Sequence, residues 1–202
     1  MAKVQKYYAV RHGKVTGVFL SWPDCQMAIE GVSRPIFKSF STPEEAEAFV
    51  NGEDIPEVKH VITDPAKAIA YTDGSYNATN CVCGYGCILI TSNGEVELFG
   101  KARCSPNDMS TMRQIPGEIE AVKEAVIYCQ KHNINDLVIY HDYTGVAEWA
   151  LGHWQANHPI TRSYQAFMQN IDIKVSFVKV AAHTHNAYNE RADKVAKKGC
   201  IV

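Results

Sequence analysis

The stretch AIAYTDGSYN, residues 68–77, decides how the larger part of this chain is understood. An apolar strand runs into Asp73 and Gly74 here, and an Asp-Gly pair after such a strand is a strong signal for a hairpin turn. The same carboxylate stands where an apolar strand ends, which is a common place to hold a metal ion. The stretch alone leaves both interpretations of Asp73 open, so carboxylates elsewhere in the chain must decide between a turn residue and a ligand.

Composition places the chain among globular proteins. It has 202 residues, of which 46% are hydrophobic and 21% charged. The first residues show no pattern of a signal peptide, and the apolar runs are far too short for a membrane span, so we expect a cytoplasmic protein without membrane contact. The oligomeric state stays open, with a monomer as the working expectation. Because the net charge is −2, any binding of nucleic acid must depend on individually placed residues.

The seven cysteines do not indicate a disulfide framework, because their number is odd and the chain is not a short secreted scaffold. Three of them, Cys81, Cys83 and Cys87, lie in the segment CVCGYGC, whose spacing raises the alternative of a zinc site. In a strand these three side chains would share one face, which favours buried thiols over a metal site.

The chain divides at an acidic segment. Residues 51–66 contain a glycine, two prolines and four acids without sustained periodicity, which is typical of a linker. We therefore expect a first domain at residues 1–52, a linker at 53–66 and a second domain at 67–202.

The order of predicted elements indicates an α/β fold of mixed α+β type. The first domain should be a small α+β unit with a three-stranded sheet and two helices, the helices beginning near Ser21 and at Ser41 or Thr42. The second should hold a mixed five-stranded sheet flanked by helices. Its strands are expected at residues 68–75, 81–91, 95–104, 136–142 and 174–182, and its helices at 116–132, 144–158, 161–170 and 186–199.

Three further carboxylates stand out beside Asp73. Glu118 falls in the first turn of a helix, where the macrodipole favours an acid, yet it also shares the apolar stripe of that helix. Asp142 ends an apolar strand and is equally suited to cap the next helix. Asp193 lies within a helix, where pairing with Lys197 is the simple alternative. Glu120 and Glu124 fall off the stripe, so we expect both at the surface.

Together, the four acids indicate a metal site more strongly than any one of them does alone. Two end strands and one opens a helix on its inner face, so a mixed sheet can bring them together at one edge. Buried carboxylates repel one another, and a group of four needs cations. Oxygen ligands suit hard divalent ions, which makes Mg²⁺ or Mn²⁺ the natural choice.

Four segments resemble the motif blocks of type 1 ribonuclease H, in the order and spacing of that family. They are YTDGSYN at 71–77, GEIEAV at 117–122, IYHDYTGV at 139–146 and AAHTHNAYNERADKVAKKG at 181–199. The resemblance implies a ribonuclease H fold and two-metal hydrolysis of the RNA strand of RNA–DNA hybrids, leaving 5′-phosphate and 3′-hydroxyl ends. Two Mg²⁺ ions are implied as cofactors, with Mn²⁺ as a substitute.

The resemblance also assigns roles to residues. Asp73, Glu118, Asp142 and Asp193 match the metal-binding catalytic acids, and His183 matches a mobile-loop histidine that assists turnover. His185 is a second candidate for that role, but His183 has the spacing to Asp193 that the family shows. The RNA strand is expected beside Gly74, Ser75, Gln114 and Glu118. Gln114 stands where many members of the family carry asparagine.

The first domain resembles the hybrid-binding domain related to caulimovirus viroplasmin. The matching segments are YYAVRHGKVTGVFLSWPDCQ at 7–26 and RPIFKSFSTPEEAEAFV at 34–50. By this resemblance Tyr8, Trp22 and Phe37 contact the nucleic acid and Lys38 grips a phosphate. Ser39 follows Lys38 where the family often has a second lysine. No basic run lies between Trp154 and Tyr164, so the first domain is expected to replace the basic protrusion of some single-domain members.

Two other classes of protein compete with this interpretation. One is a non-catalytic module that binds hybrid or double-stranded RNA on a nuclease-like scaffold, which would be expected to lack one of the acids. The other is a transposase, integrase or exonuclease of the same broad fold, which usually shows three acids in another order.

Overall fold

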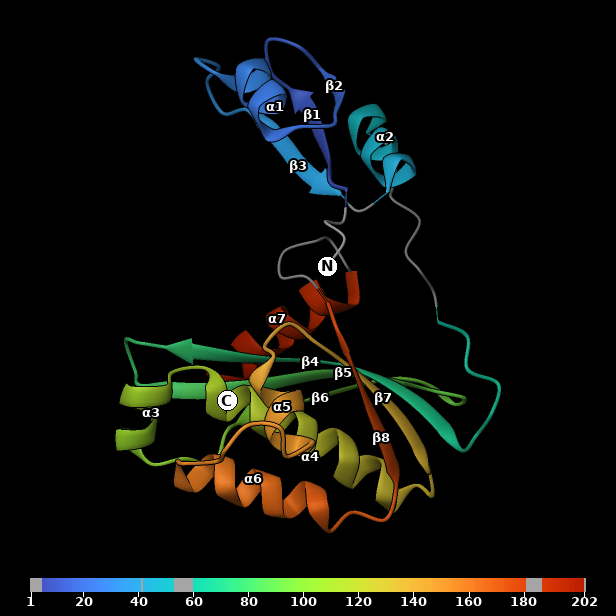
Figure 1. The fold of residues 1–202 in the computed structure, drawn as a ribbon, viewed down its shortest axis with the longest axis vertical. Coiled ribbons are helices and arrows are strands. Elements are labelled where there is room, and N and C mark those ends of the chain that lie inside the picture. Colours follow the sequence, from blue (N-terminus) through green and yellow to red (C-terminus); the bar gives the residue numbers. More distant parts are fainter. Residues whose placement is uncertain (1–4, 41, 53–59, 181–186, 202) are drawn as a thin grey trace. The chain divides into compact units, whose positions relative to one another are not determined.

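The computed structural model describes residues 5–40, 42–52, 60–180 and 187–201 (Figure 1). The chain forms two compact units, residues 1–59 and 60–202, and each is described by itself. In the described part of the chain, every helix is too short or too polar to cross a membrane.

The first unit is a three-stranded antiparallel sheet with a helix on each face. Its elements are β1 (Tyr7–His12), β2 (Gly17–Phe19), α1 (Trp22–Ile29), β3 (Ile36–Phe40) and α2 (Pro43–Asn51). The sheet has the order β2-β1-β3. Ala9 packs with Phe40 and Ala46 of α2, whereas Val10 packs with Cys25 and Ala28 of α1. Neighbouring residues of β1 therefore serve opposite faces, as strand alternation requires.

The helices of this unit begin where the sequence signals them. Ser21 caps α1 by accepting the N–H of Asp24, and Thr42 caps α2 by accepting the N–H of Glu45. A proline follows each cap within the first turn, where its missing N–H does no harm. Gly52 ends α2 with a φ of 74°, which glycine adopts without steric cost.

The second unit is built on a mixed five-stranded sheet, as predicted. The strands are β4 (Lys67–Asn77), β5 (Val82–Thr91), β6 (Gly94–Lys101), β7 (Asp136–His141) and β8 (Lys174–Lys179). Their order is β6-β5-β4-β7-β8. The pairs β4–β5 and β5–β6 are antiparallel, whereas β4–β7 and β7–β8 are parallel.

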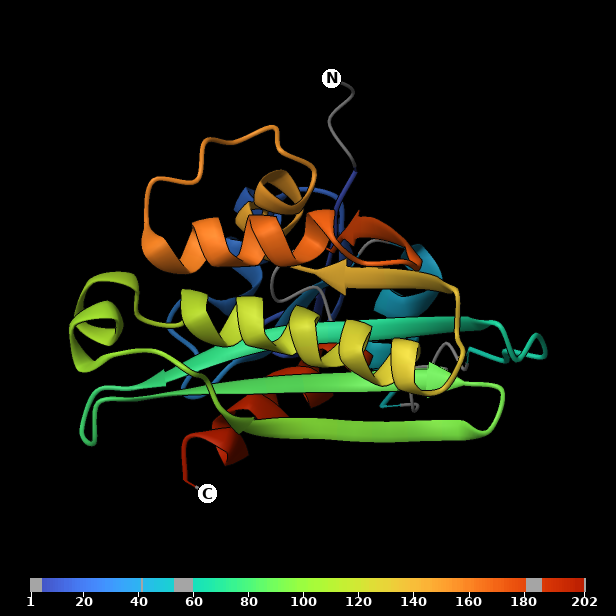
Figure 2. The ribbon, with the colours of Figure 1, turned by 90° about the horizontal axis from the view of Figure 1, so that it is seen from below.

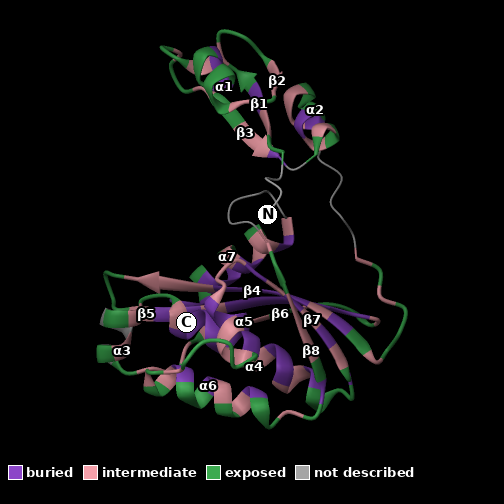
Figure 3. Cartoon of the chain, viewed as in Figure 1, coloured by how far each residue is buried: buried purple, intermediate pink, exposed green. Residues whose placement is uncertain are grey.

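Helices cover both faces of this sheet (Figure 2). They are α3 (Pro106–Met112), α4 (Ile115–Lys131), α5 (Gly145–Ala150), α6 (Pro159–Gln169) and α7 (Ala187–Gly199). The main core lies between one face and the helices α4 and α6, and it includes Ala70, Leu137, Val122 and Tyr164. On the other face, Tyr71 and Ile88 pack against Tyr188 and Ala192 of α7. Figure 3 shows the buried residues concentrated along the sheet and the facing sides of these helices.

Glycines on β5 bring α7 close to the sheet. A Cβ atom on Gly84 would lie 2.3 Å from the carbonyl oxygen of Ala196, and one on Gly86 would lie 2.3 Å from the nitrogen of Ala196. Both contacts are with backbone, so a side chain at either position would force α7 away from the sheet.

The structure corrects several predicted boundaries. Helix α3 was not expected, although Ser105 and Asp108 form its capping pair, with Asp108 N donating to Ser105 Oγ at 3.2 Å and Ser105 N to Asp108 Oδ2 at 2.9 Å. Helix α5 ends at Ala150, well before residue 158, and α6 begins at Pro159. Cys81 is exposed in the turn before β5, while Cys83 and Cys87 are buried, so the three thiols do not share one buried face.

Candidate active site

Asp73 is not a turn residue. Strand β4 continues through Asp73 and Gly74 as far as Asn77, with Asp73 opposite Gly86 and Gly74 opposite Tyr85 on β5. The chain reverses later, between Asn77 and Val82. The hairpin signal of the Asp-Gly pair was therefore misleading. The carboxylate of Asp73 lies in the middle of the sheet, 9% exposed, and accepts the N–H of Gly74 at 2.9 Å.

Glu118 lies in the first turn of α4 on its buried side, as the apolar stripe predicted, and is 3% exposed. Gly74 allows this turn to rest directly on β4. A Cβ atom on Gly74 would lie 2.4 Å from both the carbonyl oxygen of Gln114 and the nitrogen of Glu118. The bare backbone of Gly74 thus sets how near Glu118 comes to Asp73.

Asp142 directly follows β7, which is parallel to β4 and adjacent to it. The N-cap position of α5 belongs to Thr144, so the alternative that Asp142 caps this helix is wrong. Asp73, Glu118 and Asp142 come together from the two strands and α4. Each offers a carboxylate oxygen, and these oxygens lie within 4.8 Å of one another.

Burial and mutual repulsion make this cluster electrostatically strained. Burial, followed by the charges of Asp142 and Asp193, raises the pKa of Asp73 from 3.8 to about 7. Burial and the charges of Asp73 and Asp142 raise the pKa of Glu118 well above its ordinary range. Near neutral pH the cluster therefore holds protons unless positive charge compensates its carboxylates.

The side chains fit a divalent cation. Glu118 Oε2 is buried without a hydrogen-bond partner among the described residues, and a buried carboxylate oxygen left in that state is costly. All three ligand candidates are oxygen donors, the set preferred by Mg²⁺ and Mn²⁺. A bound cation would satisfy the orphaned oxygen and relieve the repulsion together.

Asp193 lies beside this cluster and is not one of the three acids that form it. Its charge contributes to the raised pKa of Asp73, so it is within electrostatic reach from α7. Its Oδ2 accepts the Nζ of Lys197 at 2.6 Å, which is the i,i+4 pair considered as the simple alternative. The two predicted histidines, His183 and His185, lie outside the described residues.

The expected neighbours of the RNA strand gather at the same crossing. Gln114 precedes α4 with its carbonyl oxygen against Gly74, and its side chain is exposed. Ser75 is the next residue of β4, and its carbonyl oxygen accepts the thiol of Cys200 at 3.5 Å. Gly74 and Gln114 thus meet at the first turn of α4 beside Glu118, whereas the contact of Ser75 is with Cys200.

Three aromatic side chains predicted for the first unit form one surface group. The ring centroids of Tyr8 and Trp22 are 5.7 Å apart, and those of Trp22 and Phe37 are 5.8 Å apart. Trp22 is 42% exposed and Phe37 40%, which is unusual for large aromatics whose role is core packing.

Lys38 does not join the aromatic group. Its Nζ lies 5.8 Å from the ring centroid of Phe40 and 5.9 Å from that of Phe49, which belong to the face of the sheet covered by α2. Strand alternation explains the separation, since Lys38 follows Phe37 and must point to the other face.

Two features near the site were missed from the sequence. Glu120, expected at the surface, is buried and forms ion pairs with Arg103 at 3.3 Å and Lys123 at 3.1 Å. Tyr143, next to Asp142, has a pKa raised by burial and by the charge of Glu118, which places its phenol near the cluster. The adjacency of Tyr143 to Asp142 was the available signal, whereas Arg103 is remote in sequence.

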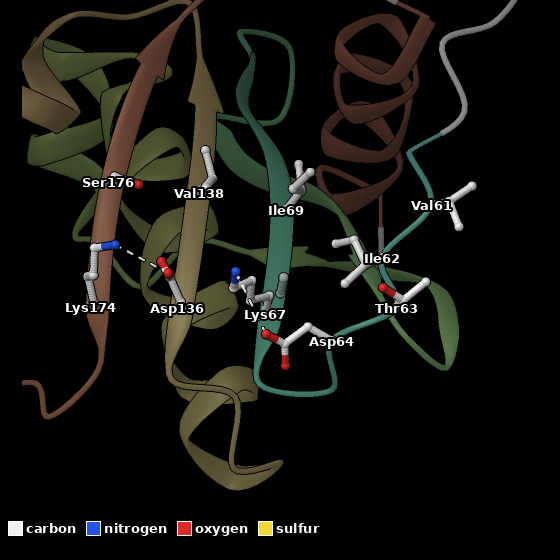
Figure 4. A pocket seen from close by; sticks show the side chains of 11 residues that line it. Val61, Ile62, Thr63, Asp64, Lys67, Ile69, Asp136, Val138, Lys174 and Ser176 are labelled. Atoms are coloured by element: carbon white, nitrogen blue, oxygen red, sulfur yellow. Dashed lines mark hydrogen bonds and ion pairs between the residues drawn. The ribbon is translucent and has the colours of Figure 1, made fainter.

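A pocket of about 420 Å³ lies at the opposite end of the strands from the acids (Figure 4). It is lined by the first residues of β4, β7 and β8, namely Lys67, Asp136 and Lys174, and by the segment 61–64. Figure 4 shows the ion pair of Lys174 with Asp136, whose Nζ and Oδ2 are 3.2 Å apart. The pocket brings no convergent set of acids to its surface and is separate from the candidate active site.

The sheet order, the helices on both faces and the acids at its centre define the class of ribonuclease H-like folds, and solved structures agree. The RNase H1 of the halophilic archaeon Halobacterium salinarum NRC-1 aligns with a TM-score of 0.51 at 23% identity, over 66% of this chain and 96% of that one. LC11-RNase H1, solved in complex with an RNA/DNA hybrid, aligns with a TM-score of 0.51 at 16% identity, over 66% of this chain and 96% of that one.

Sequence comparison then gives the family. Residues 65–201 match RNase H, and residues 6–50 match the Ribonuclease H1 N-terminal domain. Ribonuclease H1 of Mus musculus is 26% identical over 255 residues, covering 96% of this chain and 88% of the relative. Ribonuclease H of Francisella tularensis subsp. novicida (strain U112) is 27% identical over 147 residues, covering 65% of this chain and 90% of the relative. The chain belongs to the RNase H family of ribonucleases.

Proposed function

We propose that this protein hydrolyses the RNA strand of RNA–DNA hybrids with the help of two divalent cations, leaving 5′-phosphate and 3′-hydroxyl ends. The observation that carries the proposal is the cluster of buried Asp73 and Glu118 with half-buried Asp142, with an orphaned oxygen on Glu118, in a chain of the RNase H family. A cluster whose acids are strained without cations is suited to hold them beside a scissile phosphate.

Asp73, Glu118, Asp142 and Asp193 would hold the cations, Mg²⁺ or Mn²⁺ as a substitute. When bound, the cations supply activation of the attacking water and compensation of charge at the leaving oxygen. The water oxygen forms a bond to phosphorus, the bond from phosphorus to the 3′ oxygen breaks, and the 3′ oxygen ends as a hydroxyl. We assign His183 to proton movement during turnover, on the family resemblance.

The chain's own residues would position the RNA strand. Gly74 and Gln114 meet at the first turn of α4 beside Glu118, and the exposed amide of Gln114 can donate and accept hydrogen bonds. Ser75, the residue after Gly74 on β4, is proposed as a further contact of the RNA strand on the family resemblance. The 2′-hydroxyl distinguishes RNA from DNA, and the wide minor groove of a hybrid exposes it. Polar groups beside the acids can therefore select the strand that is cut.

The aromatic group of the first unit would bind the hybrid through its DNA strand. Tyr8, Trp22 and Phe37 offer partly exposed rings that can pack on sugars. Lys38 would contact a phosphate from the edge of the same sheet. Two linked binding sites raise the effective concentration of substrate at the second site, which would favour longer hybrids.

The proposal is tested by cleavage of labelled substrates. The protein is incubated with Mg²⁺ or Mn²⁺ and with an RNA–DNA hybrid, single-stranded RNA, duplex RNA or duplex DNA. We expect cutting of the RNA strand of the hybrid alone, with new 5′ ends that a phosphatase must treat before a kinase can label them. Tight binding of the hybrid without cutting under either metal would instead indicate a non-catalytic binding protein.

A further inference from the structure

The N-terminus of α4, which carries Glu118, lacks the usual side-chain cap. Gln114 occupies the N-cap position in a helical conformation, with φ −77° and ψ −16°, and its side chain makes no capping hydrogen bond. Pro116 has no N–H, so Gly117 is the N3 residue whose N–H a capping side chain would ordinarily satisfy.

A thiol from the neighbouring strand takes that place. Gly117 N donates to Cys83 Sγ at 3.1 Å and shares this hydrogen with the carbonyl oxygen of Gln114 at 2.9 Å. The Cys83 thiol in turn donates to the carbonyl oxygen of Gln114 at 3.7 Å, within the longer reach of sulfur. Cys83 thus accepts a hydrogen bond from the first turn of α4 and donates one to the carbonyl oxygen of the residue before that turn.

The environment keeps Cys83 in the form that this role needs. The residue is 1% exposed, and burial raises the pKa of its thiol to about 12. Near neutral pH it therefore stays protonated, with a sulfur that accepts and a hydrogen that donates. A buried thiol of this kind is chemically inert, which points to a structural contact and away from a reactive one.

The packing around Gly117 leaves room for this contact and little else. A Cβ atom on Gly117 would lie 2.2 Å from the carbonyl oxygen of Gly84, 3.0 Å from Gly74 Cα and 3.1 Å from Cys83 Sγ. The first turn of α4 thus rests on the backbones of β4 and β5, and the Cys83 side chain fills the adjoining space. Glu118 is the next residue, so a displacement of Gly117 moves its carboxylate relative to Asp73.

We propose that Cys83 is a positioning residue of this active site, whose sulfur caps α4 from the adjacent strand and fixes the backbone that carries Glu118. The inference rests on the proposed function, because it assumes that Glu118 helps to hold the cations. It assigns a role to a cysteine whose spacing in CVCGYGC predicts only a buried thiol.

The test measures Mn²⁺ affinity by calorimetry on the full chain, alongside the Mg²⁺ dependence of hybrid cleavage. Cys83→Ala removes the acceptor, and Cys83→Val removes it while filling the space, so a loss shared by both cannot come from a cavity. We expect both to weaken Mn²⁺ binding about fivefold to tenfold, as for the loss of one helix cap. Half-saturation by Mg²⁺ should rise by the same factor, with the KM for hybrid unchanged.

Two further variants separate positioning from general destabilisation. Cys83→Ser keeps an acceptor and should recover most of the Mn²⁺ affinity. Cys87→Ala is the matched control, because Cys87 is fully buried on the same strand and lies beside Cys129, far from the first turn of α4. It should lower the thermal stability and leave the Mn²⁺ affinity unchanged.

Each result has a definite consequence. The inference fails if the wild type binds Mn²⁺ and cleaves hybrid while Cys83→Val, folded, does the same with equal affinity. It also fails if Cys87→Ala weakens Mn²⁺ binding as much as Cys83→Val does, or if Cys83→Ser is no better than Cys83→Ala. A wild-type protein that neither binds Mn²⁺ nor cleaves hybrid would overturn the proposed function itself.

Discussion

Replacing Asp73 by asparagine is expected to stabilise the metal-free protein while removing its activity. Asparagine keeps the shape of the side chain, and its amide oxygen can still accept the N–H of Gly74. It removes the charge that burial, Asp142 and Asp193 oppose. The substitution therefore isolates the electrostatic cost of an ionised carboxylate in this cluster.

The magnitude follows from the pKa. A rise from 3.8 to about 7 is roughly three units, and each unit corresponds to about 1.4 kcal/mol of difference between the two protonation states. Because part of this interaction is shared with Glu118, we expect a gain of about 2–4 kcal/mol in the free energy of unfolding at pH 8. For a folded domain as large as the second one, this gain in the free energy of unfolding corresponds to roughly 5–15 °C in Tm.

The gain has a defined dependence on pH. The pKa of Asp73 is higher in the folded protein than in the unfolded chain, so the folded state holds the proton more tightly. In EDTA the wild type therefore becomes less stable as the pH rises from about 4 to about 7, because Asp73 loses its proton in the folded state. Asp73→Asn has no carboxylate at this position, so its stability does not decrease for this reason. The advantage of the variant should vanish below about pH 4, where Asp73 is protonated in both states.

The assay is thermal unfolding in EDTA from pH 3.5 to pH 8, repeated with Mg²⁺. The control is Asp172→Asn, which removes one carboxylate at an exposed position outside the cluster, on the connection before β8. Mg²⁺ should stabilise the wild type more than Asp73→Asn and so narrow the difference between them. The reasoning is refuted if Asp73→Asn is no more stable than the wild type at pH 8 in EDTA. It is also refuted if the variant exceeds the wild type in stability by as much at pH 3.5 as at pH 8.

Three other predictions concern the surroundings of the acids and the first unit. Gly74→Ala should lower the free energy of unfolding in urea by about 1–3 kcal/mol and abolish cleavage, because its Cβ would lie 2.4 Å from backbone atoms at the start of α4. Unchanged activity would contradict the close approach of α4 to β4 at Gly74. Lys197→Met should lower the Mg²⁺ concentration for half-maximal cleavage by freeing Asp193, with a stability change under about 1 kcal/mol because the ion pair is exposed; a higher Mg²⁺ requirement would show that Lys197 assists the site. The double variant Trp22→Ala, Phe37→Ala should raise the KM for hybrid about tenfold or more with kcat unchanged, since each ring would bury apolar surface against a sugar and so contribute about 1 kcal/mol or more; an unaltered KM would remove these rings from substrate binding.

The sequence sufficed for the sheet and for most of the acid cluster. Alternation between strands and helices predicted the five strands, and the apolar stripe of the first long helix predicted the burial of Glu118. Local spacing also gave the ion pair of Asp193 with Lys197 as the alternative to a metal-binding role, and the structure contains this pair, because residues four apart on a helix are neighbours. The strand pattern, the apolar stripe and the ion pair each depend on residues close together in the chain.

Features that depend on distant residues could not be predicted in this way. The Asp73-Gly74 pair continues a strand because β5 pairs with it and α4 rests on Gly74, and neither partner is visible in the local stretch. Glu120 is buried because Arg103, on a separate segment, pairs with it alongside Lys123.

The contact of Cys83 with Gly117 likewise joins β5 to α4, so its spacing within CVCGYGC gave no sign of it. The position of Lys38, by contrast, could have been predicted from the sequence. Side chains alternate along a strand, so Lys38 and Phe37 must point to opposite faces of the sheet.

The measurement that tests the central claim most directly is the rate of RNA cleavage in a labelled hybrid as a function of Mg²⁺ concentration, for the wild type, Asp73→Asn and Asp172→Asn. We predict no cutting in EDTA, saturable activation by Mg²⁺ for the wild type and Asp172→Asn, and a loss of about a hundredfold or more for Asp73→Asn at every concentration. Cutting that persists in EDTA, or a folded Asp73→Asn protein with wild-type rates, would contradict the assignment of this cluster as the metal-binding active site.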